Sequence, residues 1–201
     1  AFKALQEPAC TKLLGALVPG ATMAFGARVP GTSYQLDPVQ AAFNIGTMAG
    51  WLQVNDPALA TASGYVADNL GAVLAVADYR ARKALAEGES PPRVHDLFAA
   101  LIHAHELASL EWARSVGGNP ANASAAARCA LTRTASAACA GTLLGGTRDQ
   151  VAAAVAIARG EGLATTHPGT APDLDGNERW RIGDATSRGV RLALIVLAGR
   201  T

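Results

Sequence analysis

The chain has 201 residues, of which 50% are hydrophobic but only 5% aromatic, and its 17 basic side chains nearly balance 16 acidic ones. That balance, with no basic stripe interleaved with aromatic residues, argues against a nucleic-acid partner, and no apolar run reaches the roughly 18 residues needed to cross a membrane. Alanine supplies much of the hydrophobic content, which favours closely packed helices over a β-sandwich. The length suits one domain with one core.

Three cysteines, Cys10, Cys129 and Cys139, form neither a CxxC pair nor a cluster with zinc-ligand spacing. We expect them to be small core residues of a protein in a reducing, intracellular compartment, either cytoplasmic or mitochondrial. The chain begins at Ala1 rather than at methionine and shows no signal peptide, so we expect a processed or partial chain.

Residues 1–36 contain several prolines and glycines and are predicted to be irregular. Asp37 and Pro38 then provide an N-cap followed by proline at the first helical position, which predicts a helix that runs to about Leu52. A loop follows, and a second helix is predicted over residues 69–88, where a glycine ends it.

A third helix is predicted from Val94, because apolar side chains recur at spacings of three and four along one face. That face consists of Val94, Leu97, Phe98, Leu101, Ile102, His105, Ala108 and Trp112. The pattern predicts that His105 points toward the core, whereas His95 and His103 point away from it.

A loop then leads to an alanine-rich helix that ends near Gly145. Thr147 and Gln150 form a capping box in front of the next helix, and Gly183 opens a last helix near the end of the chain. Between these two helices lies a loop over 160–183, and a loop of that length is usually functional or disordered. About six helices and no convincing strand predict an all-α helical bundle.

Several stretches occur in the same order as consecutive blocks of one protein family. They are ARVPGTSYQLDPVQAAFNIGTM, WLQVNDPALA with DNLGAVLAVADY, LIHAHEL, LLGGTRDQVAAAVAIA and GDATSRGVRLAL. On these blocks nearly the whole chain resembles the MmgE/PrpD or 2-methylcitrate dehydratase family, to which cis-aconitate decarboxylase is related. The resemblance implies a single helical domain over 1–201, usually a homodimer, which full-length members join to a smaller C-terminal α/β domain that this chain lacks.

The chemistry implied by the resemblance is loss of water from a citrate-like or alkylcitrate-like polycarboxylate, with no metal or other cofactor. Cationic side chains must hold the carboxylates, and arginine is best suited because its planar fork binds a carboxylate with two bonds. A base must remove a proton beside a carboxylate, and an acid must protonate the departing hydroxyl. Histidine suits either role because its pKa lies near neutrality.

The resemblance also shows where this chain departs from its family. Tyr65 stands where typical members have the histidine of GHPSDNLG, and the segment NPANASAAARC has no histidine to match the second one of the family. Glu178 corresponds to a lysine, which reverses the sign of the charge. Asp56, in contrast, matches the aspartate of the family's Asn-Asp pair, and His105 keeps the family's AHE pattern.

We therefore predict a site with altered proton-transfer residues. The predicted catalytic residues are Asp56, Tyr65 and His105, and the predicted substrate-binding residues are Asp68, Asn69, Arg179, Ser187 and Arg188. An unperturbed tyrosine, with its pKa near 10, is a poor base at neutral pH, although a cationic cluster would lower that pKa. Arginines near the start of the last helix would bind an anion together with the helix dipole.

Each of these residues also has a purely structural interpretation. Asp56 would cap the turn before the following proline, Tyr65 would pack in its loop, Asp68 would cap the next helix, His105 would be a core histidine, and Arg188 a surface arginine. The functional hypotheses divide in the same way. The protein is a hydro-lyase of the family type, a non-catalytic dimeric scaffold or binding paralogue, or a scaffold redirected to another small-molecule reaction.

Overall fold

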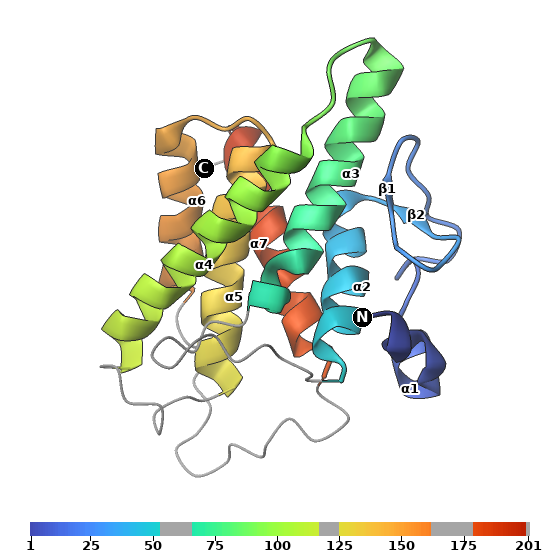
Figure 1. Ribbon diagram of the computed structural model, residues 1–201, viewed down its shortest axis with the longest axis horizontal. Coiled ribbons are helices and arrows are strands. Elements are labelled where there is room, and N and C mark those ends of the chain that lie inside the picture. Colours follow the sequence, from blue (N-terminus) through green and yellow to red (C-terminus); the bar gives the residue numbers. More distant parts are fainter. Residues whose placement is uncertain (53–65, 117–124, 162–178, 200–201) are drawn as a thin grey trace.

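The computed structural model describes residues 1–52, 66–116, 125–161 and 179–199 (Figure 1). The N-terminal arm, residues 1–36, contains η1 (Phe2–Gln6), α1 (Pro8–Thr11), β1 (Ala27–Arg28) and β2 (Gln35–Leu36). The remaining elements are α2 (Pro38–Gly50), η2 (Val66–Asn69), α3 (Leu70–Glu87), α4 (Val94–Val116), α5 (Ala125–Leu143), α6 (Arg148–Gly160) and α7 (Arg181–Leu197). The predicted all-α helical bundle is confirmed.

Local signals set several helix ends as the sequence predicts. The Asp37 carboxylate accepts hydrogen bonds from the backbone N–H groups of Val39 and Gln40, at 2.9 and 3.0 Å, and so caps α2. Thr147 and Gln150 form the predicted capping box at the start of α6. Gly88 ends α3 in the left-handed conformation, with φ of 75°.

The arm is more regular than predicted. β1 and β2 pair antiparallel, with Ala27 opposite Leu36, so the expectation of no strand is wrong for these short segments. The hairpin is tied to α3, because the Arg28 guanidinium donates to the Asp78 carboxylate at 2.6 Å and the Arg28 backbone N–H donates to it at 2.8 Å. Hydrogen bonding to a residue 50 positions away is a tertiary effect that local sequence patterns do not carry.

Helices α5 and α7 lie at the centre of the bundle, where α7 contacts α2, α3, α5 and α6, and α5 also contacts α4 (Figure 1). Small residues allow these helices to approach closely. A Cβ atom added to Gly183 in α7 would lie 2.2 Å from Thr47 Oγ1 in α2, and one added to Gly189 would lie 2.6 Å from Ser136 Cβ in α5. The alanine content of the chain is therefore used to build close helix contacts rather than a large-residue core.

The buried face of α4 matches the predicted one only in part. The residues that it buries are Ala100, Ala104, Ala108, Glu111 and Trp112, and Leu97, Leu101 and His105 are partly buried. Val94, Phe98 and Ile102, which were predicted to face the core, are exposed by 67%, 62% and 58%. A row of alanines lets α4 lie close to α5, and this rotates the larger side chains outward.

The histidines of α4 largely follow the prediction despite this rotation. His105 is half-buried, at the edge of the buried face, and His95 and His103 are exposed. Among the helices in the described parts of the chain, none has both the length and the apolar character required to cross a bilayer.

Candidate functional site

Most of the predicted site residues that the structure describes belong to segments that meet at one end of the bundle, whereas His105 lies at the middle of α4. This end, called the site end below, is formed by η2, by the C-terminal ends of α2, α4 and α6, and by the N-terminal ends of α5 and α7 (lower part of Figure 1). Residues from widely separated parts of the sequence meet there because the chain passes repeatedly along the bundle, so that the ends of several helices lie on the same side (Figure 1).

Asp68 forms a buried ion pair at the site end. Its carboxylate accepts two hydrogen bonds from the Arg128 guanidinium in α5, at 2.6 and 2.7 Å, and Thr132 Oγ1 lies 3.5 Å away. The Asp68 and Arg128 side chains are only 3% and 14% exposed. Burial raises the pKa of Asp68, and the Arg128 hydrogen bonds and charge act in the opposite direction.

This pairing overturns the structural interpretation of Asp68 as a helix cap. The N-cap of α3 is Asn69, and no side chain caps the helix at that position. The Asp68 carboxylate turns instead toward Arg128, because a buried carboxylate is stable only beside a cation or several hydrogen-bond donors. Asn69 Oδ1 accepts a hydrogen bond from Ser136 at 3.0 Å, and the Asp68 carbonyl accepts one from Thr186 at 2.9 Å.

A second arginine–carboxylate cluster lies at the same end but closer to solvent. Arg188 Nε donates to the two Glu161 carboxylate oxygens at 2.9 and 3.2 Å, and its Nη2 also contacts Glu161. Arg133 Nε lies 3.5 Å from Glu161 Oε2. The hydrogen bond from Arg188 lowers the pKa of Glu161, whereas burial raises that of the neighbouring Asp184.

The remaining charged residues at this end are also paired with protein groups. Glu111 on α4 accepts a hydrogen bond from Arg159 at 2.5 Å and one from Arg114 at 3.3 Å. Arg179 lies over the Trp51 ring at 5.9 Å and donates to the Trp51 carbonyl at 3.1 Å. These contacts hold the ends of separate helices together.

The predicted site residues thus have four different situations, of which that of His105 is described below. Asp68 and Asn69 bond to α5, Arg179 bonds to Trp51 just after α2, and Arg188 bonds to Glu161, so each of these four has a protein partner. Ser187 donates only to the Asp184 carbonyl of its own helix, at 2.8 Å. The predictions for Asp56 and Tyr65 fall outside the described residues, as does that for Glu178.

His105 carries an unexplained polar atom. Its Nδ1 is buried and has no hydrogen-bond partner within the described residues, and the same is true of Ser109 Oγ one helical turn later. Buried polar atoms are rarely left without a partner. The two atoms therefore mark one face of α4 as a place where a polar group from elsewhere would be accommodated.

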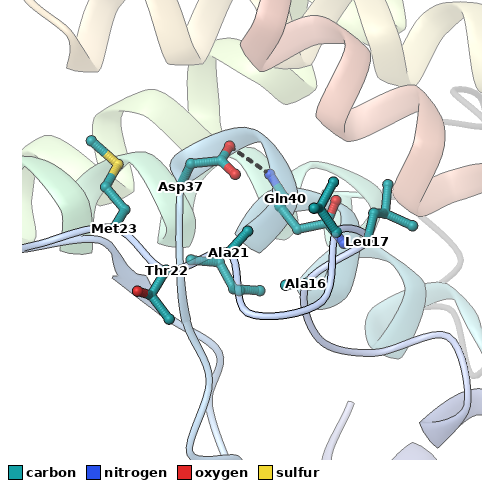
Figure 2. A pocket seen from close by; sticks show the side chains of 9 residues that line it. Ala16, Leu17, Ala21, Thr22, Met23, Asp37 and Gln40 are labelled. Atoms are coloured by element: carbon teal, nitrogen blue, oxygen red, sulfur yellow. Dashed lines mark hydrogen bonds between the residues drawn. The ribbon is translucent and has the colours of Figure 1, made fainter.

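Two cavities in the described parts of the chain lie away from the site end. One, of about 390 Å³, is lined by residues that include Arg80, Pro92, His103 and Leu143. The other, of about 150 Å³, lies beside the arm, and Figure 2 shows Met23 and Leu17 at its two sides and Asp37 hydrogen-bonded to Gln40. Asp37 has a structural role there as the cap of α2.

Sequence patterns missed Arg128, Arg133 and Glu161. The two arginines interrupt an alanine-rich helix, and a charged residue within an otherwise small and apolar helix was the available signal. Glu161 gave a weaker signal, since it follows the last residue of α6 and its partners lie on other helices.

Comparison with known proteins identifies the family to which this chain belongs. The model of the MmgE/PrpD N-terminal domain matches residues 1–201. The chain belongs to the MmgE/PrpD family. Among its MmgE/PrpD relatives, 2-methylcitrate dehydratase of Cupriavidus necator is 46% identical over 98% of this chain, and that of Salmonella typhimurium strain LT2 is 44% identical over the same share.

A eukaryotic MmgE/PrpD relative is similar over the same region. The mitochondrial 2-methylcitrate dehydratase of Yarrowia lipolytica is 39% identical over 98% of this chain and 38% of its own length. The chain spans about 40% of the length of the bacterial relatives. The match therefore covers less than half of each relative, and the matching family model is that of an N-terminal domain.

Proposed function

We propose that this MmgE/PrpD domain belongs to a hydro-lyase that removes water from a citrate-like or alkylcitrate-like polycarboxylate. The observation that carries the proposal is the match of the whole chain to the family's N-terminal domain, together with relatives named 2-methylcitrate dehydratase at 44–46% identity. The proposal treats residues 1–201 as one helical domain that acts with a C-terminal domain like that of full-length members.

The charges of the site end support this substrate class. Arg133 on α5 and Arg188 on α7 contact the same carboxylate, that of Glu161. Two arginines of this end already bind carboxylates through forked hydrogen bonds, Arg128 to Asp68 and Arg188 to Glu161. Arginine binds a ligand carboxylate in the same geometry. A substrate with several carboxylates would therefore be attracted to this end.

The dehydration needs one base and one acid. A base removes the proton from the carbon beside a carboxylate, the electron pair of that C–H bond forms the double bond, and the hydroxyl on the adjacent carbon leaves as water after it is protonated. We assign one of these roles to His105, whose buried Nδ1 has no partner among the described residues. Asp56 and Tyr65 remain the proposed companions of His105.

A non-catalytic scaffold or binding paralogue is the second candidate. It is favoured by two observations. Neither of the two cavities described above reaches the site end, and most of the charged residues described there are paired with one another, although Arg179 Nε is buried without a hydrogen-bond partner among the described residues. A working active site needs room for substrate beside its acid and base.

An assay of the natural polypeptide that contains this chain separates the two candidates. The protein is incubated with 2-methylcitrate and, in parallel, with citrate, and the conjugated double bond of the unsaturated acid is followed by ultraviolet absorbance. Product formation that falls by roughly 10²–10⁴ in His105→Gln supports the dehydratase with His105 in a proton-transfer role. No product from wild-type enzyme at high concentration rejects the dehydratase and leaves the scaffold.

We also propose that the protein is a homodimer. The support is the exposed apolar row of α4, formed by Val94, Phe98, Ile102 and Leu110, which no element of the described chain covers. Phe98 and Ile102 lie one helical turn apart at the middle of this row and would pack against the same two residues of a second copy running antiparallel.

A further inference from the structure

The contacts of Glu161 resemble those of a bound ligand carboxylate. Arg188 presents Nε to both Glu161 oxygens, at 2.9 and 3.2 Å. Arg133 Nε donates to the Ala158 carbonyl at 3.1 Å and lies 3.5 Å from Glu161 Oε2, so its guanidinium adds a second positive charge beside the carboxylate. Two guanidinium groups from different helices therefore converge on one carboxylate. Arginine uses the same fork to recognise carboxylate ligands.

The position of Glu161 in its own helix does not favour a negative charge. Glu161 is the C-cap of α6, where the helix dipole and the last carbonyl groups disfavour an acid. Its carboxylate is held there by the arginines of α5 and α7 rather than by local helix chemistry. Arg191 adds a further positive charge that acts on Glu161.

The Glu161–Arg188 pair is more exposed to solvent than the Asp68–Arg128 pair at the same end. Asp68 and Arg128 are 3% and 14% exposed, so a ligand cannot replace Asp68 without unfolding its surroundings. Glu161 and Arg188 are 25% and 39% exposed, whereas Arg133, at 13%, lies behind them. The Glu161 carboxylate can therefore leave, and a ligand carboxylate can take its place from solvent.

We propose that Arg133 and Arg188 form a carboxylate-binding site whose occupant in the ligand-free protein is Glu161. A polycarboxylate binds by placing one carboxylate on the two guanidinium groups, and Glu161 is displaced into solvent. The identity of the ligand class rests on the proposed function. The exchange replaces one arginine–carboxylate contact by another, so Glu161 weakens ligand binding and sets the affinity of the site.

Isothermal titration with tricarballylate tests this site. Tricarballylate has three carboxylates and no hydroxyl group, so it cannot be dehydrated, and binding is measured apart from catalysis. Glu161→Gln removes the competing charge and is expected to bind tricarballylate at least about ten-fold more tightly than wild type, which is the effect of one charge-assisted contact. The double variant Glu161→Gln/Arg188→Gln is expected to lose that gain.

Two controls separate the site from a general charge effect. Glu87→Gln changes the net charge equally at a surface pair with Lys83, and Glu111→Gln uncovers a different pair of arginines at the same end. Neither variant is expected to bind tricarballylate more tightly. Circular dichroism melting confirms that each variant is folded, and Glu161→Ser replaces Glu161→Gln if the latter does not fold.

The outcomes of these titrations and of the dehydration assay lead to different conclusions. Equal affinity of Glu161→Gln and wild type, or a gain that survives Arg188→Gln, would overturn the proposal. Tighter binding by Glu161→Gln in a polypeptide that never dehydrates 2-methylcitrate would keep this site and reject the dehydratase. Turnover by wild type without any effect of Glu161→Gln on tricarballylate binding would do the reverse.

Discussion

At the scale of single residues, the same pair of chemical groups has two different roles at the site end. Asp68 with Arg128 is sealed from solvent, whereas Glu161 with Arg188 is within reach of it. A buried ion pair is held because removal of either partner leaves an uncompensated charge. The half-exposed pair loses little when one partner is replaced, because water compensates the other.

The buried pair gives the first prediction. Arg128→Met leaves the Asp68 carboxylate buried without its cation and is expected to lower the free energy of unfolding by about 3–5 kcal/mol. Urea denaturation followed by circular dichroism measures this change. Arg188→Met serves as the matched control and is expected to cost about 1 kcal/mol or less. Equal losses in the two variants would show that Asp68 and Arg128 are not a sealed pair.

The cysteines give the second prediction. The three thiols are unpaired, as their spacing suggested, with Cys10 and Cys139 buried and Cys129 partly buried. Burial raises the pKa of Cys10 and Cys129 to about 11 and that of Cys139 to about 12. Because the thiolate is the reactive form, only about one thiol in a thousand is reactive at pH 8 for Cys10 and Cys129, and about one in ten thousand for Cys139.

Labelling of the native protein with Ellman's reagent at pH 8 is accordingly expected to be slow at all three positions. Addition of guanidinium chloride should expose the thiols, return each pKa to its ordinary range and allow three equivalents to react rapidly. The native rate should rise about ten-fold per pH unit, since the raised pKa values lie above the pH used. Rapid labelling of one equivalent in the native state would identify a thiol with an ordinary pKa.

At the scale of elements, close approach between small residues decides how the helices pack. The buried row of α4 is built largely from alanines, and this is why its larger apolar residues face outward. Gly189 in α7 shows the same principle, because a Cβ atom there would lie 2.6 Å from Ser136 Cβ and 2.6 Å from the Arg133 carbonyl oxygen. Neither neighbour is the end of a flexible side chain.

Gly189→Ala gives the third prediction. Replacement of glycine by alanine inside a helix normally stabilises it by about 0.5–1 kcal/mol, but here the added methyl group must separate α7 from α5. The variant is expected to be less stable than wild type by about 1–3 kcal/mol. Gly160→Ala is the control, since nothing lies within 4 Å of a Cβ atom there. Thermal melts in which both variants gain stability would contradict the packing described for Gly189.

At the scale of the whole molecule, the arrangement separates a charged end from an apolar flank. The site end gathers arginines and carboxylates from four helices, whereas Phe98 and Ile102 on α4 are 62% and 58% exposed. An apolar row on the surface of a folded domain usually marks an interaction surface. One face of a single helix of 23 residues offers less surface than the roughly 800 Å² that each partner buries in a standard interface.

The fourth prediction concerns this apolar row. If α4 pairs with α4 of a second copy, Ile102→Glu places two like charges at the centre of the pair and is expected to convert the dimer to monomer in sedimentation velocity. The small area predicts dissociation in the micromolar range, so the measurement covers several protein concentrations. Val18→Glu, at an equally exposed position of the arm, should leave the dimer intact. A wild-type protein that stays monomeric at high concentration would refute the pairing.

The sequence by itself determined the helical class, the family and most helix ends. The caps at Asp37 and Thr147 and the stop at Gly88 depend on residues within a few positions of each other, so local chemistry is sufficient. The resemblance likewise needed only the order of the blocks, and the family match confirmed it.

Only the tertiary structure decided the environments of the side chains. The partner of Asp68 lies 60 positions away and that of Arg188 lies 27 positions away, so no local pattern could assign either one. The face of α4 was predicted only in part for the same reason, because periodicity counts apolar residues while packing selects the small ones that fit against α5. The partners of these charged residues and of this helix face lie on segments distant in the sequence. Which segments come into contact depends on how the whole bundle packs.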